Sequence, residues 1–380
     1  VAIAGTLGIT TSDTQTFSGA VSFGAAASFT TSNDNISFSS TLNSISSAQT
    51  LSISIGTGTL QFAGAVGATQ AVGATTITAG TATFLDAFYS TGNTSITATN
   101  INTAAAKVFS VISSANLTMT TDNLAIAADL TGSSGGTLTI QPRTNSKAIG
   151  LGSTAAGDLS LDDTELGYVN GKFGSLIFGS TTGTALITVD YASAFTYTQT
   201  LTVRSSSTGS ITIKDTLNSG AYALTVNSGA VSTLNPAEIV AGNLSVTGTL
   251  ITLSNNVTTT GTQSYTGPVV LSASISLDST TGSAAGRAMQ FSSSINGTIN
   301  NSESLSINAG TGGTLSVDGA IGATTPLATL TLTHSGGATF TGAVTTGTSI
   351  VLSNTASVAT VSFLNNVSTP TFTTTSNAYN

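Results

Sequence analysis

Short runs of alternating apolar and hydroxyl-bearing residues recur along almost the whole chain, and this pattern constrains the fold more than any other feature. In each run, Leu, Ile or Val residues stand two positions apart with Ser or Thr between them, which is the period of a β-strand with one buried face. Gly, Asn, Asp and Ser clusters separate the runs and supply turns. The pattern excludes an α/β sheet, because no amphipathic helices alternate with the strands. The clearest runs are 51–55, 138–140, 159–161, 201–203, 211–213, 224–226 and 244–246.

The spacing of these runs predicts how the strands are arranged. Strands are expected to start roughly every ten residues between 201 and 244, and a similar series extends from 305 to 361. Two strands per coil then give coils of about 20 residues, which lies within the range of solenoid repeats. The sequence therefore predicts an all-β fold: a parallel β-helix (β-solenoid) of roughly 20-residue coils, about 19 in number, stacked into one continuous, elongated rod.

The composition agrees with a stacked β-structure. Only 6% of the residues are charged, whereas ordinary globular domains carry about 25%. The hydrophobic fraction is 39% and the mean hydropathy is +0.33, so the chain can bury a core and is not disordered. The polar remainder is almost entirely Ser, Thr, Asn and Gly, which favour strands, turns and side-chain ladders over helices.

The sequence also contains a repeat much longer than one coil. The run 14–21 (TQTFSGAV) reappears at 262–269 (TQSYTGPV), and the run 51–56 (LSISIG) reappears at 305–310 (LSINAG). The offset grows from 248 residues, between Phe17 and Tyr265, to 255 residues, between Val72 and Leu327, so small insertions accumulate in turns. We expect residues 1–247 to form a first long solenoid unit, with a charged, decorated segment at 138–190. Residues 248–380 then form a partial second copy.

Apolar positions are shared between the copies, whereas polar positions are not, which indicates that packing is what repeats. Asp318 stands opposite Ala63, and His334 stands opposite Ala79. Phenylalanines alternate with aliphatic residues in the other copy, which predicts that they stack in the core. The aligned aromatic positions are Phe23, Phe29, Phe38, Phe62 and Phe84, opposite Leu271, Leu277, Phe291, Val317 and Phe340. Tyrosines at 89, 168, 191, 197 and 222 are not assigned to the core by this pattern.

These repeated motifs resemble the repeat region of large filamentous-haemagglutinin-like bacterial exoproteins. The likeness is carried by the pattern TQTFSGAV…LSISIGTGTLQFAGAVGAT and its second copy, and by the segment from Leu138 to Gly179. The resemblance implies a secreted rod at the bacterial cell surface that takes part in adhesion, aggregation or biofilm formation. The family's secretion domain and terminal recognition domains have no counterpart here.

The charge and the cysteine content limit the classes of partner and ligand that the chain is expected to bind. The net charge is −8 with no concentrated basic patch, so nucleic acid is not an expected partner. The chain has no Cys, which removes disulfides and thiolate metal sites. No apolar run reaches the ~18 residues needed for a membrane helix, and membrane insertion is not expected. Since the chain begins at Val1 inside patterned sequence, we expect an internal segment of a longer, exported polypeptide.

The densest group of charges is the only candidate for site chemistry. Asp162, Asp163 and Glu165 have the composition of a Ca²⁺ site or of paired carboxylates acting on a carbohydrate. The favoured alternative is a short helical turn over the same residues, with Asp162 or Asp163 capping its N-terminus. The sequence also lacks the G-G-x-G-x-D repeats of calcium solenoids. The group as a whole contains Arg143, Lys147, Asp158, Asp162, Asp163, Glu165, Tyr168 and Lys172.

Other polar motifs carry no specific chemistry. His334 is the single histidine, and the chain has no Cys or second His with which it could bind zinc. Serine is abundant throughout the chain, so the presence of serines near His334 is no evidence for a catalytic triad. The glycines at Gly171 and at Gly310 open no phosphate-binding motif and are expected to form turns.

The sequence thus predicts a non-enzymatic structural segment of a surface fibre, with no cofactor and no catalytic or metal residue assigned. Each coil is expected to hydrogen-bond to its neighbours, with Asn, Ser and Thr ladders at the corners. Open strand edges at the ends predict self-association or continuation into a filament. Two alternatives stay open. One is a solenoid surface, around 158–172, that binds host or matrix glycans or host receptors. The other is a polysaccharide-cleaving β-helix enzyme, whose groove lies within 143–172.

Overall fold

A computed structural model describes residues 1–234, 238–355 and 359–375 of the chain. Almost all of the secondary structure is β, with 2% helix, and the strands form stacked parallel sheets. The chain divides into two compact units, Val1–Gly183 and Thr184–Asn380, and each is a parallel β-solenoid. Coils contain roughly 22 residues, and the two units together contain about 17 coils. The predicted fold class is therefore confirmed, with slightly longer and fewer coils than the spacing indicated.

Each regular coil contributes three strands rather than the predicted two. Val21 pairs with Leu42, one coil later, and two further strands lie between them in the chain. The two-strand prediction was wrong because many of the strands have only three residues, such as Val21–Phe23. An alternating pattern of that length is too short to recognise in a sequence.

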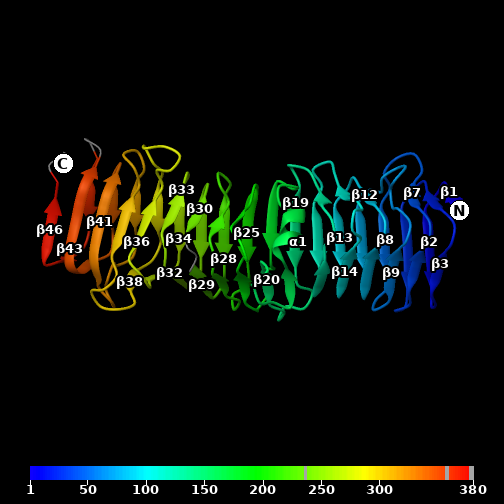
Figure 1. Ribbon diagram of the computed structural model, residues 1–380, viewed down its shortest axis with the longest axis horizontal. Helices are drawn as coiled ribbons and strands as arrows, with labels where there is room; N and C mark the ends of the chain where they lie inside the picture. Colours follow the sequence, from blue (N-terminus) through cyan, green and yellow to red (C-terminus); the bar gives the residue numbers. More distant parts are fainter. Residues whose placement is uncertain (235–237, 356–358, 376–380) are drawn as a thin grey trace. The chain divides into compact units, whose positions relative to one another are not determined.

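In the first unit the strands form three walls, which can be followed in Figure 1. The first wall contains β2 (Leu7–Thr11), β5 (Ala27–Thr31), β8 (Leu51–Ser54), β10 (Thr75–Thr78), β13 (Thr94–Thr97), β16 (Leu117–Thr120), β19 (Thr137–Gln141) and β22 (Ser175–Phe178). The second contains β3 (Gln15–Phe17), β6 (Ile36–Phe38), β9 (Thr59–Phe62), β11 (Thr81–Phe84), β14 (Asn100–Thr103) and β17 (Asn123–Ala125). The third contains β1 (Ala2–Ile3), β4 (Val21–Phe23), β7 (Leu42–Ser44), β12 (Phe88–Ser90), β15 (Phe109–Val111) and β18 (Leu130–Thr131), bridged between β7 and β12 by Val66.

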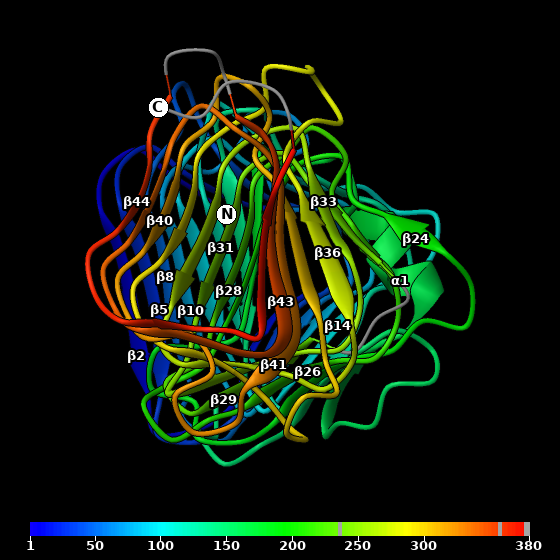
Figure 2. The same ribbon diagram turned by 90° about the vertical axis from the view of Figure 1, so that its left-hand side faces the viewer.

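The segment after β19 departs from this plan. It contains β20 (Ile149–Leu151) and β21 (Leu159–Leu161), which pair with each other, and then α1 (Asp163–Val169). Within the described ranges α1 is the only α-helix, and it packs on β18 and β21. Figure 2 shows α1 at the periphery of the coils, outside their walls.

The second unit repeats the three-walled plan, and Figure 2 shows its strands β28, β31, β40 and β44 lying one behind another. One wall contains β25 (Thr200–Arg204), β28 (Leu224–Asn227), β31 (Leu244–Thr247), β34 (Gln263–Thr266), β37 (Met289–Phe291), β40 (Leu315–Val317), β42 (Ala338–Phe340) and β44 (Val361–Phe363). Another contains β23 (Ile187–Val189), β26 (Ile211–Ile213), β29 (Val231–Leu234), β32 (Leu250–Leu253), β35 (Val269–Leu271) and β38 (Ile295–Gly297). The last contains β24 (Phe195–Thr196), β27 (Leu217–Asn218), β30 (Ile239–Ala241), β33 (Val257–Thr259), β36 (Ile275–Asp278), β39 (Leu305–Asn308), β41 (Leu327–Ser335) and β43 (Val344–Thr355), which pairs with β45 (Val367–Ser368) and β46 (Thr371–Thr374).

Apolar side chains fill the interior of each unit and stack along it. Phe38, Phe62 and Phe84 occupy matching positions on successive coils, with ring centroids 5.3 Å apart at each step. All the phenylalanines assigned to the core, and the residues aligned with them, are buried. Stacked aromatic pairs add to the gain from burying their area. Of the unassigned tyrosines, Tyr191 and Tyr197 are buried as well, whereas Tyr222 is exposed.

Side-chain ladders tie the coils together at the corners, as predicted. The Asn93 Oδ1 atom accepts a hydrogen bond from the backbone N–H of Asn116 at 2.9 Å. The Asn116 Oδ1 atom in turn accepts one from Thr137 N at 2.9 Å, one coil further on. Each asparagine thereby satisfies a backbone N–H donor of the next coil.

Candidate functional site

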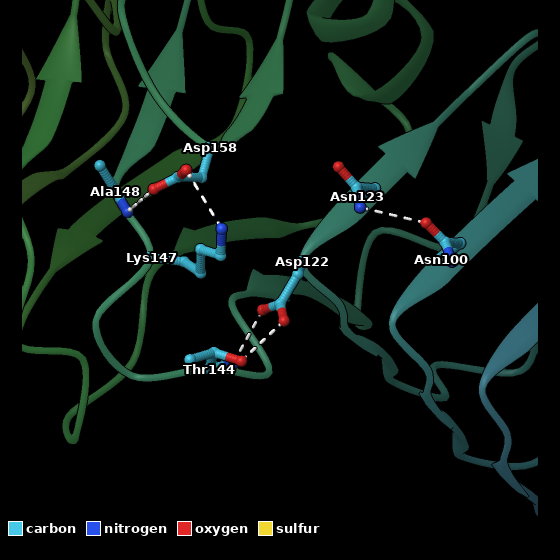
Figure 3. A network of polar contacts seen from close by, with 7 residues as sticks. All are labelled: Asn100, Asp122, Asn123, Thr144, Lys147, Ala148 and Asp158. Carbon is cyan, nitrogen blue, oxygen red and sulfur yellow. Dashed lines mark hydrogen bonds and ion pairs between the residues drawn. The ribbon is translucent and has the colours of Figure 1, made fainter. Parts of the chain in front are cut away.

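The charged residues between 143 and 172 fall into two groups, one in the turns around β20 and one around α1. Figure 3 shows the first group together with residues of the preceding coils. Both groups lie in the first unit, in the segment that departs from the regular three-walled plan. This part of the chain is where chemistry other than packing is expected.

Asp122, which precedes the charged segment in the chain, is the most constrained carboxylate beside the first group. Its Oδ1 atom accepts a hydrogen bond from Thr144 N at 2.7 Å, and its Oδ2 atom accepts one from Thr144 Oγ1, also at 2.7 Å. The residue is buried, and Figure 3 shows its side chain directed at the turn of the following coil. Asp122 therefore fixes the turn that follows β19, so its role is structural.

Lys147 and Asp158, which lie just before β20 and β21, form an exposed ion pair. The Lys147 Nζ atom lies 3.2 Å from Asp158 Oδ1, and Asp158 Oδ2 accepts a hydrogen bond from Ala148 N at 3.0 Å (Figure 3). The Ala148 N–H first, and then Lys147, holds the pKa of the Asp158 carboxyl below its usual range. Asp158 is thus an ionised turn residue.

Four further hydrogen bonds in this region run along the stacking direction. Asn123 Nδ2 donates to Asn100 Oδ1 at 3.0 Å, as Figure 3 shows, and Asn100 Nδ2 donates to Thr81 Oγ1 at 3.1 Å. The Arg143 guanidinium donates to Thr99 Oγ1 at 2.8 Å and to the carbonyl of Ala79 at 3.3 Å. Arg143 therefore lies across earlier coils and braces them.

The second group forms the N-terminus of α1. Asp162 is the N-cap, and its Oδ1 atom accepts a hydrogen bond from Glu165 N at 2.8 Å. The Glu165 Oε2 atom accepts from Asp162 N at 3.1 Å, which completes a capping box. The predicted short helical turn with an aspartate cap is confirmed, and Asp162 rather than Asp163 is the cap.

The remaining carboxylate oxygens near α1 accept backbone donors from neighbouring segments. Glu165 Oε1 accepts from Ile126 N at 3.0 Å, which ties the helix to the coil below. Burial of the Glu165 carboxyl raises its pKa above the usual range. The hydrogen bonds that it accepts from the backbone N–H groups of Ile126 and Asp162 oppose this shift. Asp163 Oδ1 accepts from Ser153 N at 2.8 Å. Asp162, Asp163 and Glu165 are therefore used to hold the helix in place.

The structure does not bring the candidate carboxylates into a metal-binding arrangement. Within residues 1–234, 238–355 and 359–375, no three His, Cys, Asp or Glu residues are grouped so that they can hold a metal ion. Lys172 lies beside the helix and contacts Asp129, with its Nζ atom 2.5 Å from Oδ2. Asp122 and Asp129 were not predictable as partners of this segment. Each is an isolated acid, distant in the chain from the residue that it contacts.

His334 lies in the second unit, on β41, far along the chain from the charged segment. It lines a small cavity of about 240 Å³ together with Thr280, Asn308 and Thr311. Gly171 and Gly310 have φ angles of 70° and 74°, as expected of turn glycines.

No family model, no curated protein and no solved structure matches this chain. No helix in the described part of the chain has the length and apolar character of a membrane span.

Proposed function

We propose that this chain is a structural segment of a secreted bacterial surface fibre, acting as a stiff stack of coils and not as an enzyme. The observation that carries the proposal is the uniform parallel pairing, in which each strand hydrogen-bonds to the equivalent strand one coil away. A stack of this kind resists extension and proteolysis because no coil can leave without breaking pairing on two sides.

The side chains support a scaffold role. The charged side chains of the candidate site and the neighbouring Asp122 hydrogen-bond to turns, to a helix N-terminus and to earlier coils, as Asp122, Glu165 and Arg143 illustrate. The repeat pattern that resembles filamentous-haemagglutinin-like exoproteins supports export to the bacterial surface and a part in adhesion, aggregation or biofilm formation.

The last described coil supports the proposal of further stacking. Its apolar residues Val367 and Phe372 are exposed, at 39% and 46%. The residues that they pair with one coil earlier, Val344 and Ile350, are buried. Exposed apolar side chains and open strand edges favour the addition of another coil. We propose that the next coil belongs either to the same polypeptide or to another molecule, giving a filament.

The proposal is tested in the bacterium that produces the protein. Antibodies against residues 1–380 are applied to intact cells, and surface fibres are imaged by electron microscopy before and after in-frame deletion of the segment. The expected result is labelled surface fibres that become shorter on deletion, with reduced cell aggregation. Labelling only after the cells are permeabilised, or fibres of unchanged length, would contradict the proposal.

A further inference from the structure

A surface cavity of about 470 Å³ lies beside α1 in the first unit, and we call it the α1 cavity. It is lined by the turn before β15, the turn before β18 and the helix, through Lys107, Val108, Ala127, Asp129, Thr131 and Tyr168 among others. In the third wall, α1 packs on β18 where a regular coil would place a strand. The cavity therefore arises from the segment that departs from the scaffold. Its volume is that of a small-molecule site.

The charges on the cavity wall are paired with opposite charges. Lys107 Nζ lies 2.9 Å from Asp86 Oδ1, and Lys172 Nζ lies 2.5 Å from Asp129 Oδ2. A hydrogen bond from Lys107 holds the pKa of the Asp86 carboxyl below its usual range, so this pair stays ionised. The wall is consequently neutral overall, and it offers no net attraction to an anion or a cation.

Polar atoms on the wall nevertheless retain hydrogen-bonding capacity. Lys107 has further N–H donors, and Asp129 has a second carboxylate oxygen. Thr131 and Tyr168 each add a hydroxyl group, which can donate and accept, to the same wall. The wall therefore offers both hydrogen-bond donors and hydrogen-bond acceptors. A hydroxyl group can pair with either, so this wall suits a ligand rich in hydroxyl groups.

The apolar part of the wall contains an aromatic ring. Tyr168 belongs to α1, whose residues Leu166 and Val169 are buried, so the helix that carries the ring is anchored. Val108 and Ala127 line the cavity with it. An anchored ring beside small apolar groups, bordered by polar atoms, matches a molecule with one apolar face and hydroxyl groups at its edge.

We propose that the α1 cavity binds a neutral saccharide unit, with a pyranose face against Tyr168 and its hydroxyl groups hydrogen-bonded to Asp129, Thr131 and Lys107. This activity is independent of the proposed scaffold role, because a stack of coils can stiffen a fibre with or without a ligand on its side.

The test uses the full chain and methyl glycosides of glucose, galactose, mannose and N-acetylglucosamine, in both anomeric forms. Binding is measured by saturation-transfer NMR and by calorimetry up to about 20 mM, a range set by the modest affinity expected for a single sugar ring. At least one glycoside is expected to bind saturably. Tyr168→Ala and Asp129→Asn should each weaken binding at least tenfold, whereas Tyr168→Phe should retain it within about threefold.

Two control variants separate recognition from damage to the fold. Tyr222→Ala removes an exposed tyrosine of the second unit and should leave binding unchanged. Lys172→Met breaks the same ion pair as Asp129→Asn but leaves the carboxylate, so binding should stay within about threefold. Hydrogen exchange at Leu166 reports whether α1 is intact in every variant.

Three outcomes overturn the proposal. They are absence of saturable binding by every glycoside, unchanged affinity in Tyr168→Ala with α1 intact, and binding of only charged sugars when a methyl glucuronide and glucosamine are added to the panel.

Discussion

At position 263 a glutamine side chain lies inside the second unit, and both of its polar atoms have partners. Its Nε2 atom donates to the carbonyl of Asp278 at 3.0 Å, and its Oε1 atom accepts from Tyr265 Oη at 2.9 Å. Gln15 is the equivalent residue of the first copy, and its Nε2 atom donates to the carbonyl of Thr30 at 2.9 Å. Its Oε1 atom is buried with no partner in the described structure. Phe17 stands where the second copy has Tyr265, and a phenyl ring has no hydroxyl to donate.

Tyr265→Phe should therefore lower the free energy of unfolding by about 1–3 kcal/mol, because it leaves a buried amide oxygen unsatisfied. The reciprocal variant Phe17→Tyr should raise it by up to about 1 kcal/mol. Rings 17 and 265 stack on the next coil with similar geometry, at centroid distances of 4.8 and 4.7 Å, so each substitution fits its site. Urea unfolding and hydrogen exchange at β34 and β3 measure both effects. Equal stability of Tyr265→Phe and the parent chain would refute this account of the pair.

Glu303 shows how a buried carboxylate is tolerated in a turn. It accepts from Thr298 Oγ1 at 2.6 Å and from Ile299 N at 3.2 Å. Burial alone would raise its pKa, but these hydrogen bonds outweigh burial and hold the pKa below the usual range. The side chain folds against Gly297, where any β-carbon would lie 2.4 Å from Glu303 Oε2. The ionised form is therefore part of the folded turn.

A group with a lowered folded pKa stabilises the protein above its unfolded pKa, about 4.3 for glutamate, and loses this contribution as the pH falls through the folded value. The parent chain should lose stability below about pH 4.5 through Glu303. Glu303→Gln should cost about 1–2 kcal/mol at pH 7, and its difference from the parent should shrink at pH 3. Unfolding measured from pH 3 to 7 checks this, with exposed Glu238→Gln as control. A difference that does not change with pH would exclude the role of the carboxylate.

At the scale of elements, α1 is a seven-residue helix held by its N-terminal bonds and two buried side chains. A helix of this length is not stable alone, so its hydrogen bonds and packing contacts with the rest of the protein decide whether it forms. The pattern of acids at 162–165 was sufficient to predict the cap, because capping is local in sequence. The bond from Ile126 N to Glu165 was not predictable, since it joins positions 39 residues apart.

Asp162→Ala should destabilise α1 by about 1 kcal/mol and increase hydrogen exchange at Glu165 and Leu166. Asp162→Asn is the matched control, because asparagine caps helices as well as aspartate does. If the alanine and asparagine variants exchange at the same rate, the capping box is not what holds the helix.

Glycines mark the corners where one coil crosses closely over another. A β-carbon on Gly64 would lie 2.3 Å from the backbone carbon of Ser40, and one on Gly319 would lie 2.3 Å from that of Ser293. The two glycines are equivalent positions of the repeat. No side chain fits at either position without movement of the backbone below.

Gly64→Ala should cost about 1–3 kcal/mol through this overpacking. Gly19→Ala should change stability by less than about 1 kcal/mol, because its β-carbon would have no heavy atom within 4 Å. Thermal unfolding of both variants makes the comparison. Similar melting temperatures for the two would contradict the close approach at Gly64.

At the scale of the whole molecule, strand period and repeat spacing were enough to predict a parallel solenoid. They did not predict three strands per coil, because three-residue strands such as Phe88–Ser90 carry too little pattern. The candidate site was predictable only where its hydrogen bonds join residues close together in the sequence, as at Asp162. Contacts between coils, such as that of Asp122 with Thr144, depend on the register in which successive coils pair. That register could not be predicted from the sequence.

The proposed end-to-end association depends on the exposed apolar residues of the last described coil. Phe372→Lys should reduce concentration-dependent association, measured by light scattering and sedimentation, because it places a charge in the proposed contact. Tyr222→Lys is the matched control, since Tyr222 is equally exposed, at 46%, on a turn of the second unit. A parent chain that stays monomeric at all concentrations would contradict association through this coil.

The most direct test of the stacked coils measures distances along one wall. Residues 28, 52, 76, 95, 118 and 139 pair in sequence on the first wall of the first unit, and the chain has no native Cys to interfere with spin labels. Pairs of labels are placed at Ser28 and at Ser95, Thr118 or Thr139. Parallel stacking predicts mean distances that grow by about 4.8 Å per coil, reaching about 24 Å at Thr139. Distances that do not increase by one constant step per coil would contradict parallel stacking.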